Sequence, residues 1–199
     1  MRIISTLSGR IFRKLAALIL VIVALLLLGD KLFAYIGKQI YPTKYSEYIE
    51  NYSKDYGVDI AFCYAMVKCE SNFDPSAESA AGARGLMQLT DDTYNWLCSR
   101  IYGKELSDDL LCDPETNLRC GIYYLSYLTE QFGTRAEVIA AYNAGPAKVK
   151  EWLSDSEYSA DGKTLLKTPY GETENHIKKV ITAEERYNKL YDFNSQGAE

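Results

Sequence analysis

The chain has 199 residues, enough for one domain with a sizeable core and one additional segment. Its formal net charge is −5 and its pI about 5.1, so no basic surface indicates a nucleic-acid partner. His176 is the single histidine, which argues against a multi-histidine metal site, and no C-x-x-C pair occurs among the five cysteines. We therefore expect no metal.

The N-terminal part predicts a membrane-targeting segment. Leu15–Leu28 is unbroken and apolar, and Arg10, Arg13 and Lys14 precede it. As a helix this run measures about 21 Å, short of the hydrocarbon core of about 30 Å, and apolar neighbours on both sides lengthen it. The alternative is a cleaved signal peptide. Because no small-x-small cleavage site follows Leu28, we expect a retained single-pass anchor with its N-terminus in the cytoplasm.

Three regions follow from this reading. Residues 1–40 are expected to form a cytoplasmic tip, a transmembrane helix and a stalk; residues 41–191 a mostly α-helical domain outside the cytoplasm; and residues 192–199 a tail. Apolar residues recur at helical spacing from Tyr45 to Tyr52, and Gly57 ends this helix. Further helices are predicted to begin at Asp59, Thr90, Asp113-Pro114, the capping box Thr134-x-x-Glu137, Ala147 and near Glu172. No strand pattern is convincing.

The helix that begins at Asp59 carries a candidate catalytic acid. Ile60, Cys63 and Val67 form an apolar stripe, and Glu70 falls on the same stripe. A carboxylate on an inward face loses water, which disfavours its ionised form and suits a general acid near neutral pH. The alternative is a structural glutamate, paired with a basic residue or partly exposed at the helix end.

Residues 71–90 lack clear periodicity, and Pro75, Gly82 and Gly85 mark tight turns. A loop of this length inside a compact domain is typical of functional or disordered segments. Because it combines apolar and small residues, we expect an ordered loop that forms one wall of a cleft.

The cysteines leave two interpretations open. A domain outside the cytoplasm permits a disulfide, for example between Cys98 and Cys112, whereas the alternative is that most cysteines are small buried hydrophobes. A Cys-His peptidase would depend on His176, and no cysteine lies in a reactive helix N-terminal setting.

Four segments carry a family resemblance: Glu70-Ser71, Ser79-x-x-Gly-Ala-x-Gly-Leu-Met-Gln88, Ala141-Tyr-Asn-Ala-Gly145 and Pro169-Tyr-x-Glu-Thr173. In this order they resemble the motifs of the soluble lytic transglycosylase catalytic domain, over about residues 45–190. The resemblance implies a lysozyme-like α-helical fold and a bacterial enzyme that acts on peptidoglycan glycan strands. It implies cleavage of the β-1,4 bond between N-acetylmuramic acid and N-acetylglucosamine, with 1,6-anhydro ends as products and no cofactor.

The resemblance also implies a role for Glu70. This side chain would protonate the glycosidic oxygen while the sugar's N-acetyl group stabilises the developing cation. Glu70 would then take the proton of the sugar's 6-hydroxyl, which attacks the anomeric carbon. A nucleophile tethered within the same sugar has a large effective concentration.

The second motif implies three further roles. Ser79 would hydrogen-bond the substrate near the cleaved bond, Met87 would form an apolar wall of the groove, and Gln88 would orient the sugar through its amide. For each residue the alternative is packing or capping.

The last two motifs imply that Tyr142 and Asn143 reach the N-acetyl group or Glu70, and that Glu172 binds the peptide stem or supports the groove. Their alternatives are a core tyrosine, a helix-end asparagine and a first-turn acid. His176 stands where the family usually has a tyrosine, three residues after the threonine of the last motif. A lysozyme-type muramidase that uses water, and a wall-binding module without turnover, remain as rival functions. The protein partners are not indicated by the sequence.

Overall fold

The computed structural model describes residues 2–193 and separates the chain into two compact units, Met1–Pro42 and Thr43–Glu199. Side chains are described from Leu15 onward, except at positions 17, 24 and 27. The expected tail at residues 192–199 falls almost entirely on residues 194–199, which lie outside the described residues.

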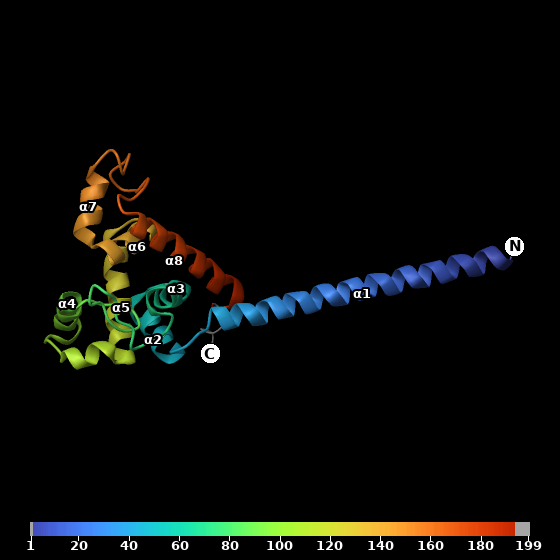
Figure 1. Ribbon diagram of the computed structural model, residues 1–199, viewed down its shortest axis with the longest axis horizontal. Coiled ribbons are helices and arrows are strands. Elements are labelled where there is room, and N and C mark those ends of the chain that lie inside the picture. Colours follow the sequence, from blue (N-terminus) through green and yellow to red (C-terminus); the bar gives the residue numbers. More distant parts are fainter. Residues whose placement is uncertain (1, 194–199) are drawn as a thin grey trace. The chain divides into compact units, whose positions relative to one another are not determined.

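The first unit contains one long helix, α1 (Arg2–Ile40) (Figure 1). Within it, Leu18–Ile40 is a stretch of 23 residues with a mean hydropathy of 2.3 and no buried part. Leu20 and Leu25 are 70% and 63% exposed. At about 1.5 Å per residue this stretch matches the thickness of a bilayer core. An apolar N-terminal helix is therefore present, and both a membrane anchor and a signal sequence have this form.

The second unit is built from helices, as expected. They are α2 (Ser46–Tyr56), α3 (Ile60–Ser71), α4 (Asp91–Tyr102), the 3₁₀ helix η1 (Asp108–Cys112), α5 (Pro114–Gln131), α6 (Arg135–Ala144), α7 (Pro146–Ser154) and α8 (Gly171–Leu190). Within residues 2–193, β structure is limited to isolated bridges such as that between Ser159 and Leu165. The mostly α fold class is confirmed.

Side-chain caps place three of the predicted helix starts. Asp59 accepts a hydrogen bond from the Phe62 amide at 2.9 Å, and Asp113 accepts one from the Thr116 amide at 2.9 Å. Thr90 caps α4 in the same way. These bonds satisfy backbone donors that the first turn of a helix leaves unpaired, so each helix begins where the sequence predicts.

Helix α3 lies at the centre of the domain. Every residue from Ala61 to Val67 is buried, so α3 is apolar on all sides. The single inward stripe predicted for this helix is therefore wrong, because α3 has no exposed face until its last turn. Only there do polar side chains emerge, among them Glu70 and Ser71.

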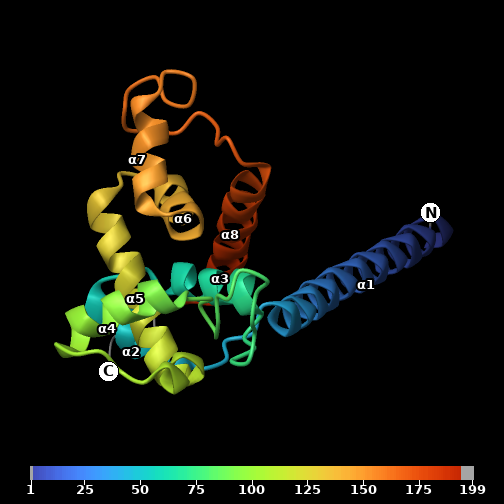
Figure 2. The ribbon, with the colours of Figure 1, turned by 60° about the vertical axis from the view of Figure 1, so that its left-hand side comes forward.

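Helices α5 and α8 connect the two ends of the domain. Helix α5 packs against α2, α4 and η1 in one part of the domain and against α6 in the other. Helix α8 packs against both α6 and α3 (Figures 1 and 2). This arrangement brings the end of α3, the end of α6 and the start of α8 to one place.

The five cysteines are all free thiols, and Cys63, Cys98 and Cys120 are buried. The example of a disulfide between Cys98 and Cys112 is not found in the structure. Burial, reinforced by the charge of the neighbouring Glu70, raises the pKa of Cys69 to about 11. Three of the five cysteines are therefore small buried hydrophobes, and Cys69 and Cys112 are partly exposed.

Candidate active site

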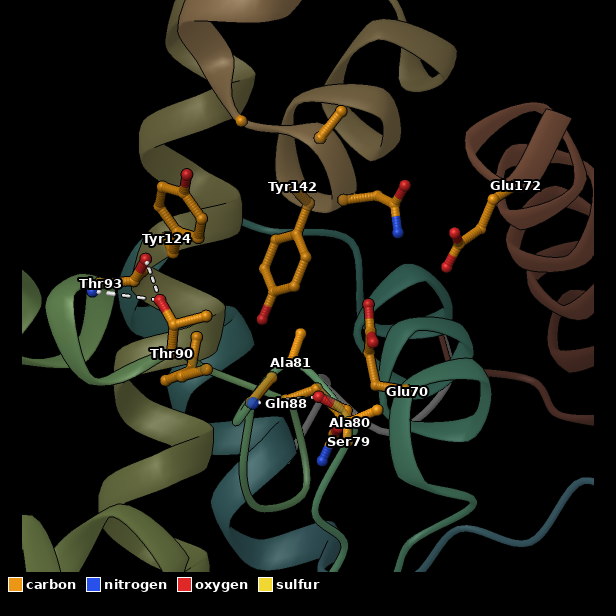
Figure 3. Close-up of a pocket in the computed structure, with 15 residues that line it drawn as sticks. Glu70, Ser79, Ala80, Ala81, Gln88, Thr90, Thr93, Tyr124, Tyr142 and Glu172 are labelled. Atoms are coloured by element: carbon orange, nitrogen blue, oxygen red, sulfur yellow. Dashed lines mark hydrogen bonds between the residues drawn. The ribbon is translucent and has the colours of Figure 1, made fainter. Parts of the chain in front are cut away.

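A cleft of about 560 Å³ opens where α3, α6, α8 and the loop 72–90 meet (Figure 3). Six of the seven predicted site residues line it: Glu70, Ser79, Gln88, Tyr142, Asn143 and Glu172. Met87 is not among the lining residues. The structure thus brings residues from all four sequence motifs to one surface.

Glu70 lies in the last turn of α3, and its side chain is 13% exposed. Its Oε1 lies 3.2 Å from Nε2 of His176 on α8, whose side chain is also 13% exposed. The two atoms are at ion-pair distance, but the contact lacks hydrogen-bond geometry, and Nε2 has no other hydrogen-bond partner among the described residues. The candidate acid therefore faces an imidazole in a largely dry setting.

The loop 72–90 is ordered and forms the floor of the cleft, as predicted. Ser71 ties it to α3 by donating a hydrogen bond of 2.8 Å to the Leu86 carbonyl. Gly85 turns the chain at a φ of +81°, and a Cβ there would lie 2.3 Å from Nδ2 of Asn117. Only glycine meets both the conformation and the close approach.

Asn117 of α5 holds this loop through hydrogen bonds to its backbone. Its Oδ1 accepts a 2.8 Å hydrogen bond from the Met87 amide, and its Nδ2 donates to the carbonyls of Leu111 and Arg84 at 2.8 and 3.2 Å. The side chain is fully buried. One amide thus satisfies three backbone groups that the irregular loop would leave unpaired.

The Met87 side chain points into the core and not into the cleft. It is fully buried, and a Cβ added at Gly121 of α5 would lie 2.2 Å from its sulfur. The expected apolar wall formed by Met87 is therefore not found. Its buried position packs the loop against α5.

Ser79 and Gln88 both line the cleft while holding the loop. The Ser79 hydroxyl accepts a 3.0 Å hydrogen bond from the Ala83 amide. The Gln88 amide nitrogen donates to the carbonyls of Ala77 and Gly85 at 3.0 and 3.1 Å. The Ser79 hydroxyl proton and the Gln88 Oε1 remain for other partners. Gln88 also adopts a positive φ of 49°, a conformation typical of positions held by their surroundings.

Tyr142 stands above Glu70 on α6 (Figure 3). Its hydroxyl donates a 2.7 Å hydrogen bond to the Met87 carbonyl. Burial, with the charge of Glu70 as a second cause, raises the pKa of Tyr142 well above its ordinary value. The hydroxyl therefore stays protonated and acts as a fixed donor.

Asn143 and Glu172 occupy the α6 and α8 sides of the cleft. The Asn143 Oδ1 accepts a 2.8 Å hydrogen bond from the buried Thr173 hydroxyl. This bond joins the third motif to the fourth and leaves the Asn143 amide group as a donor. Glu172 is exposed in the first turn of α8 and is the second carboxylate that lines the cleft.

The profile of the Transglycosylase SLT domain matches residues 47–166. The chain belongs to this family.

Relatives and solved structures agree with this membership. This chain is 32% identical over 164 residues to a protein of Escherichia coli K12 named soluble lytic murein transglycosylase. The matched region covers 80% of this chain and 25% of that protein. It is also 30% identical to membrane-bound lytic murein transglycosylase C of Pectobacterium atrosepticum, and this match covers 73% of this chain and 47% of that protein. Among solved structures, an inactive glutamate-to-glutamine mutant of the lytic transglycosylase Slt from Pseudomonas aeruginosa matches with a TM-score of 0.64 and 30% identity. This match covers 77% of this chain and 26% of that chain.

These matches identify the helical unit as a lysozyme-like SLT domain. The chain spans about a quarter to a half of the length of these relatives. Within residues 2–193, no group of three or more His, Cys, Asp or Glu side chains is arranged to hold a metal ion.

Three polar residues that line the cleft of the SLT domain are not among the predicted site residues: Thr90, Thr93 and Tyr124. The sequence predicts Thr90 as the cap of α4 and as the last residue of the loop 71–90 that forms a wall of the cleft. Tyr124 is 8% exposed, and its ring lies 5.2 Å from that of Tyr142. Its position between Ile122 and Leu125 on the inner side of α5 predicts a buried side chain but does not indicate that the side chain lines a cleft.

Proposed function

We propose that this SLT domain cleaves the β-1,4 bond between N-acetylmuramic acid and N-acetylglucosamine without water and leaves 1,6-anhydro ends. The observation that carries the proposal is the position of Glu70. It lies in a cleft shared with residues of the second, third and fourth motifs, and its side chain is 13% exposed. Family membership supports the substrate class.

Glu70 acts first as the acid. It transfers its proton to the glycosidic oxygen as the bond to the anomeric carbon breaks. Low exposure favours this step, because little water competes with the glycosidic oxygen for the Glu70 carboxyl group. Tyr142 beside it stays uncharged and holds the loop in position.

Glu70 then acts as the base. Its carboxylate takes the proton of the 6-hydroxyl, whose oxygen forms the new bond to the anomeric carbon of the same sugar. The proton count closes, because Glu70 ends the reaction as it began. The attacking oxygen is tethered, so its effective concentration is far above that of a free nucleophile.

The polar groups around Glu70 orient the sugars. The Asn143 amide group is available to the N-acetyl carbonyl, and the Gln88 Oε1 and the Ser79 hydroxyl are available on the loop side. Glu172 lies at the exposed edge of the cleft, where a peptide stem would leave the glycan.

Hydrolysis is the second candidate, and one observation favours it. Glu172 is a second carboxylate in the same cleft, and most glycosidases use two carboxylates, one to activate water or attack the sugar. Mass spectrometry of the products separates the two candidates, because hydrolysis gives reducing ends and the proposed reaction gives anhydro ends.

The deciding experiment uses the full chain on purified glycan strands. The parent should release anhydro products, and Glu70→Gln should fold with an unchanged melting curve and release none. Full cleavage by this variant would remove Glu70 from the mechanism. A folded parent that binds strands and releases no product would favour the wall-binding module.

The apolar helix α1 is proposed to remain as an anchor in the bacterial cytoplasmic membrane, with the SLT domain outside. Its length and apolar surface support this, as does a relative named as membrane-bound. The full chain should sediment with membranes at its intact mass of 22.5 kDa. Leu20→Arg should weaken this association, since a central arginine costs about 2.5–3.5 kcal/mol on insertion. A shorter chain, free outside the membrane, would instead identify a signal sequence.

A further inference from the structure

Aromatic side chains continue from the cleft along α4 and α5. Thr93 and Tyr124 line the cleft on these two helices (Figure 3). Trp96 lies one turn after Thr93 on α4, and Tyr127 lies one turn after Tyr124 on α5. Because side chains three positions apart share a face of a helix, Trp96 and Tyr127 extend the faces that line the cleft.

The rings of Trp96, Tyr124 and Tyr127 form one connected group. The Trp96 ring lies 6.0 Å from the Tyr124 ring and 4.9 Å from the Tyr127 ring, at interplanar angles of 76° and 67°. The two tyrosine rings lie 6.4 Å apart and are stacked at 18°. Tyr124 belongs both to the cleft and to this group, so the rings are continuous with the cleft.

Trp96 opens this group of rings to solvent. It is 36% exposed and is one of the few large apolar side chains that the described part of the helical unit leaves exposed. Tyr127 beside it is half-buried. A single exposed apolar residue is ordinary, but an exposed indole that adjoins a cleft is typical of a binding surface.

Arg100 adds hydrogen-bond donors to the rings. Its guanidinium carbon lies 5.1 Å from the centre of the Trp96 ring and 5.3 Å from that of Tyr127. Its Nε donates to the Tyr123 hydroxyl at 3.4 Å, and its exposed terminal amino groups are available to oxygen atoms of a ligand. Among the described residues that line the cleft, none is a lysine or an arginine. Arg100 therefore supplies a kind of donor that the cleft lacks.

From this continuity we propose that Trp96, Tyr127 and Arg100 form an outer subsite, which binds the glycan strand where it leaves the cleft. The proposal rests on the proposed function and deepens it, because it extends the surface that holds the substrate. A cleft of about 560 Å³ has the size that encloses a small molecule. The proposed substrate is a polymer, so its strand has to continue over the surface outside the cleft.

The chemistry of the outer subsite suits a sugar. A β-1,4-linked pyranose carries its hydroxyl and acetamido groups around the rim of the ring and its C–H groups on the two faces. The C–H groups pack against the electron-rich face of an aromatic ring, and the indole of Trp96 is the largest ring here. The guanidinium of Arg100 donates to the hydroxyl and carbonyl oxygens at the rim.

The binding test uses the full chain in a mild detergent, with β-1,4-linked oligomers of N-acetylglucosamine from the disaccharide to the hexasaccharide. Glu70→Gln is the background protein in every arm, so that bound oligomers are not cut. Short oligomers are held by the cleft alone, whereas long ones reach the outer subsite. In Trp96→Ala we expect about three- to tenfold weaker binding of the hexasaccharide and unchanged binding of the disaccharide, measured by calorimetry.

Leu110→Ala is the matched control, because Leu110 is 39% exposed on η1 and does not belong to the group of rings. It should bind the hexasaccharide as the background protein does. Trp96→Phe keeps a smaller ring and should restore part of the affinity. An unchanged affinity of Trp96→Ala for the hexasaccharide would overturn the proposal. An equal loss for both oligomers would also overturn it, since it would assign Trp96 to the packing of the cleft.

Fluorescence reports Trp96 without removing it. The chain has 2 tryptophans, so in Trp152→Phe the indole emission comes from Trp96 alone. A sugar stacked on this indole displaces water from it, and the emission should move to shorter wavelength with the hexasaccharide but not with the disaccharide. Identical spectra with and without saturating hexasaccharide would overturn the proposal, even where Trp96→Ala fails to fold.

The two proposals fail differently. Cleavage of glycan strands by Glu70→Gln at the parent's rate would remove Glu70 as the acid, and the fluorescence of Trp96 would still test the outer subsite. Anhydro products from the parent, an inactive Glu70→Gln and an unchanged hexasaccharide affinity in Trp96→Ala would remove only the outer subsite and leave the reaction scheme standing.

Discussion

The hydroxyl of Tyr142 donates a 2.7 Å hydrogen bond to the backbone carbonyl of Met87, 55 residues earlier in the chain. This bond fastens the end of α6 to the loop that forms the cleft floor. The same carbonyl belongs to the residue whose amide is held by Asn117. Both backbone polar groups of Met87 are thereby held, one by α5 and the other by α6.

Tyr142→Phe tests this link. The change leaves the Met87 carbonyl without its donor, so the free energy of unfolding should fall by about 1–3 kcal/mol. Guanidinium denaturation measures it. Tyr124→Phe is the matched control, because the Tyr124 hydroxyl makes no hydrogen bond within residues 2–193, and it should change stability by under about 0.5 kcal/mol. Equal losses for the two variants would contradict the link.

Gly121→Ala tests the packing beneath the loop. Alanine usually stabilises a helix interior by about 0.5–1 kcal/mol relative to glycine. Here the new Cβ would meet the Met87 sulfur at 2.2 Å, so overpacking should reverse the sign and destabilise by about 1–3 kcal/mol. Gly133→Ala, with nothing within 4 Å of its Cβ, is the control. A Gly121→Ala protein as stable as the parent would show that Met87 can repack freely.

Thr173→Val tests the contact between the third and fourth motifs. It removes the 2.8 Å hydrogen bond to Asn143 and keeps the shape of the side chain. We expect a stability loss of about 1 kcal/mol, and about tenfold lower kcat/KM because the Asn143 amide loses its orientation. Thr129→Val removes a similar bond, to the Leu125 carbonyl at 2.8 Å within α5. If both variants lose activity equally, the effect is not specific to the cleft.

The segment between α7 and α8 should respond to acid. Hydrogen bonds from the backbone amides of Lys163 and Thr164 lower the pKa of Asp161 from its ordinary 3.8 to about 2. A depressed pKa means that the carboxylate stabilises the folded turn fully above pH 3.8, and that this contribution is lost as the pH falls through about 2. The NMR shifts of these amides should move in that window and stay constant in Asp161→Asn. A transition centred near pH 4 would contradict the assignment.

Local sequence rules located the helices because caps act within one turn. Asp59 and Asp113 mark starts that the structure reproduces. The capping box at Thr134 differs. The Thr134 hydroxyl donates to the buried Glu137 carboxylate, whose other oxygen accepts from the Leu165 amide at 2.8 Å. Glu137 serves a segment 28 residues away, and no local pattern contains that partner.

The sequence predicts most of the candidate site but not its long-range contacts, because a local pattern does not contain a distant partner. Motif residues at fixed spacing pointed to Glu70 and its neighbours, and six of the seven line one cleft. The motif predicts Met87 in the groove because its sequence neighbours lie there. In the structure its side chain instead occupies the space beside Gly121 in the core. The contact between Glu70 and His176 joins residues on different helices, so only the packing of α8 on α3 reveals it.

The burial of α3 on all sides limits which substitutions can alter the substrate preference or the rate of this protein. Glu70, the proposed acid, lies at the end of a helix that is buried in the core, so a shift of this carboxylate would require the neighbouring helices to move as well. Adjustments of preference or speed are therefore expected to accumulate in the loop 72–90 and the first turns of α8. Mutational libraries directed there should yield altered enzymes, whereas changes along residues 61–67 should mostly yield unfolded chains.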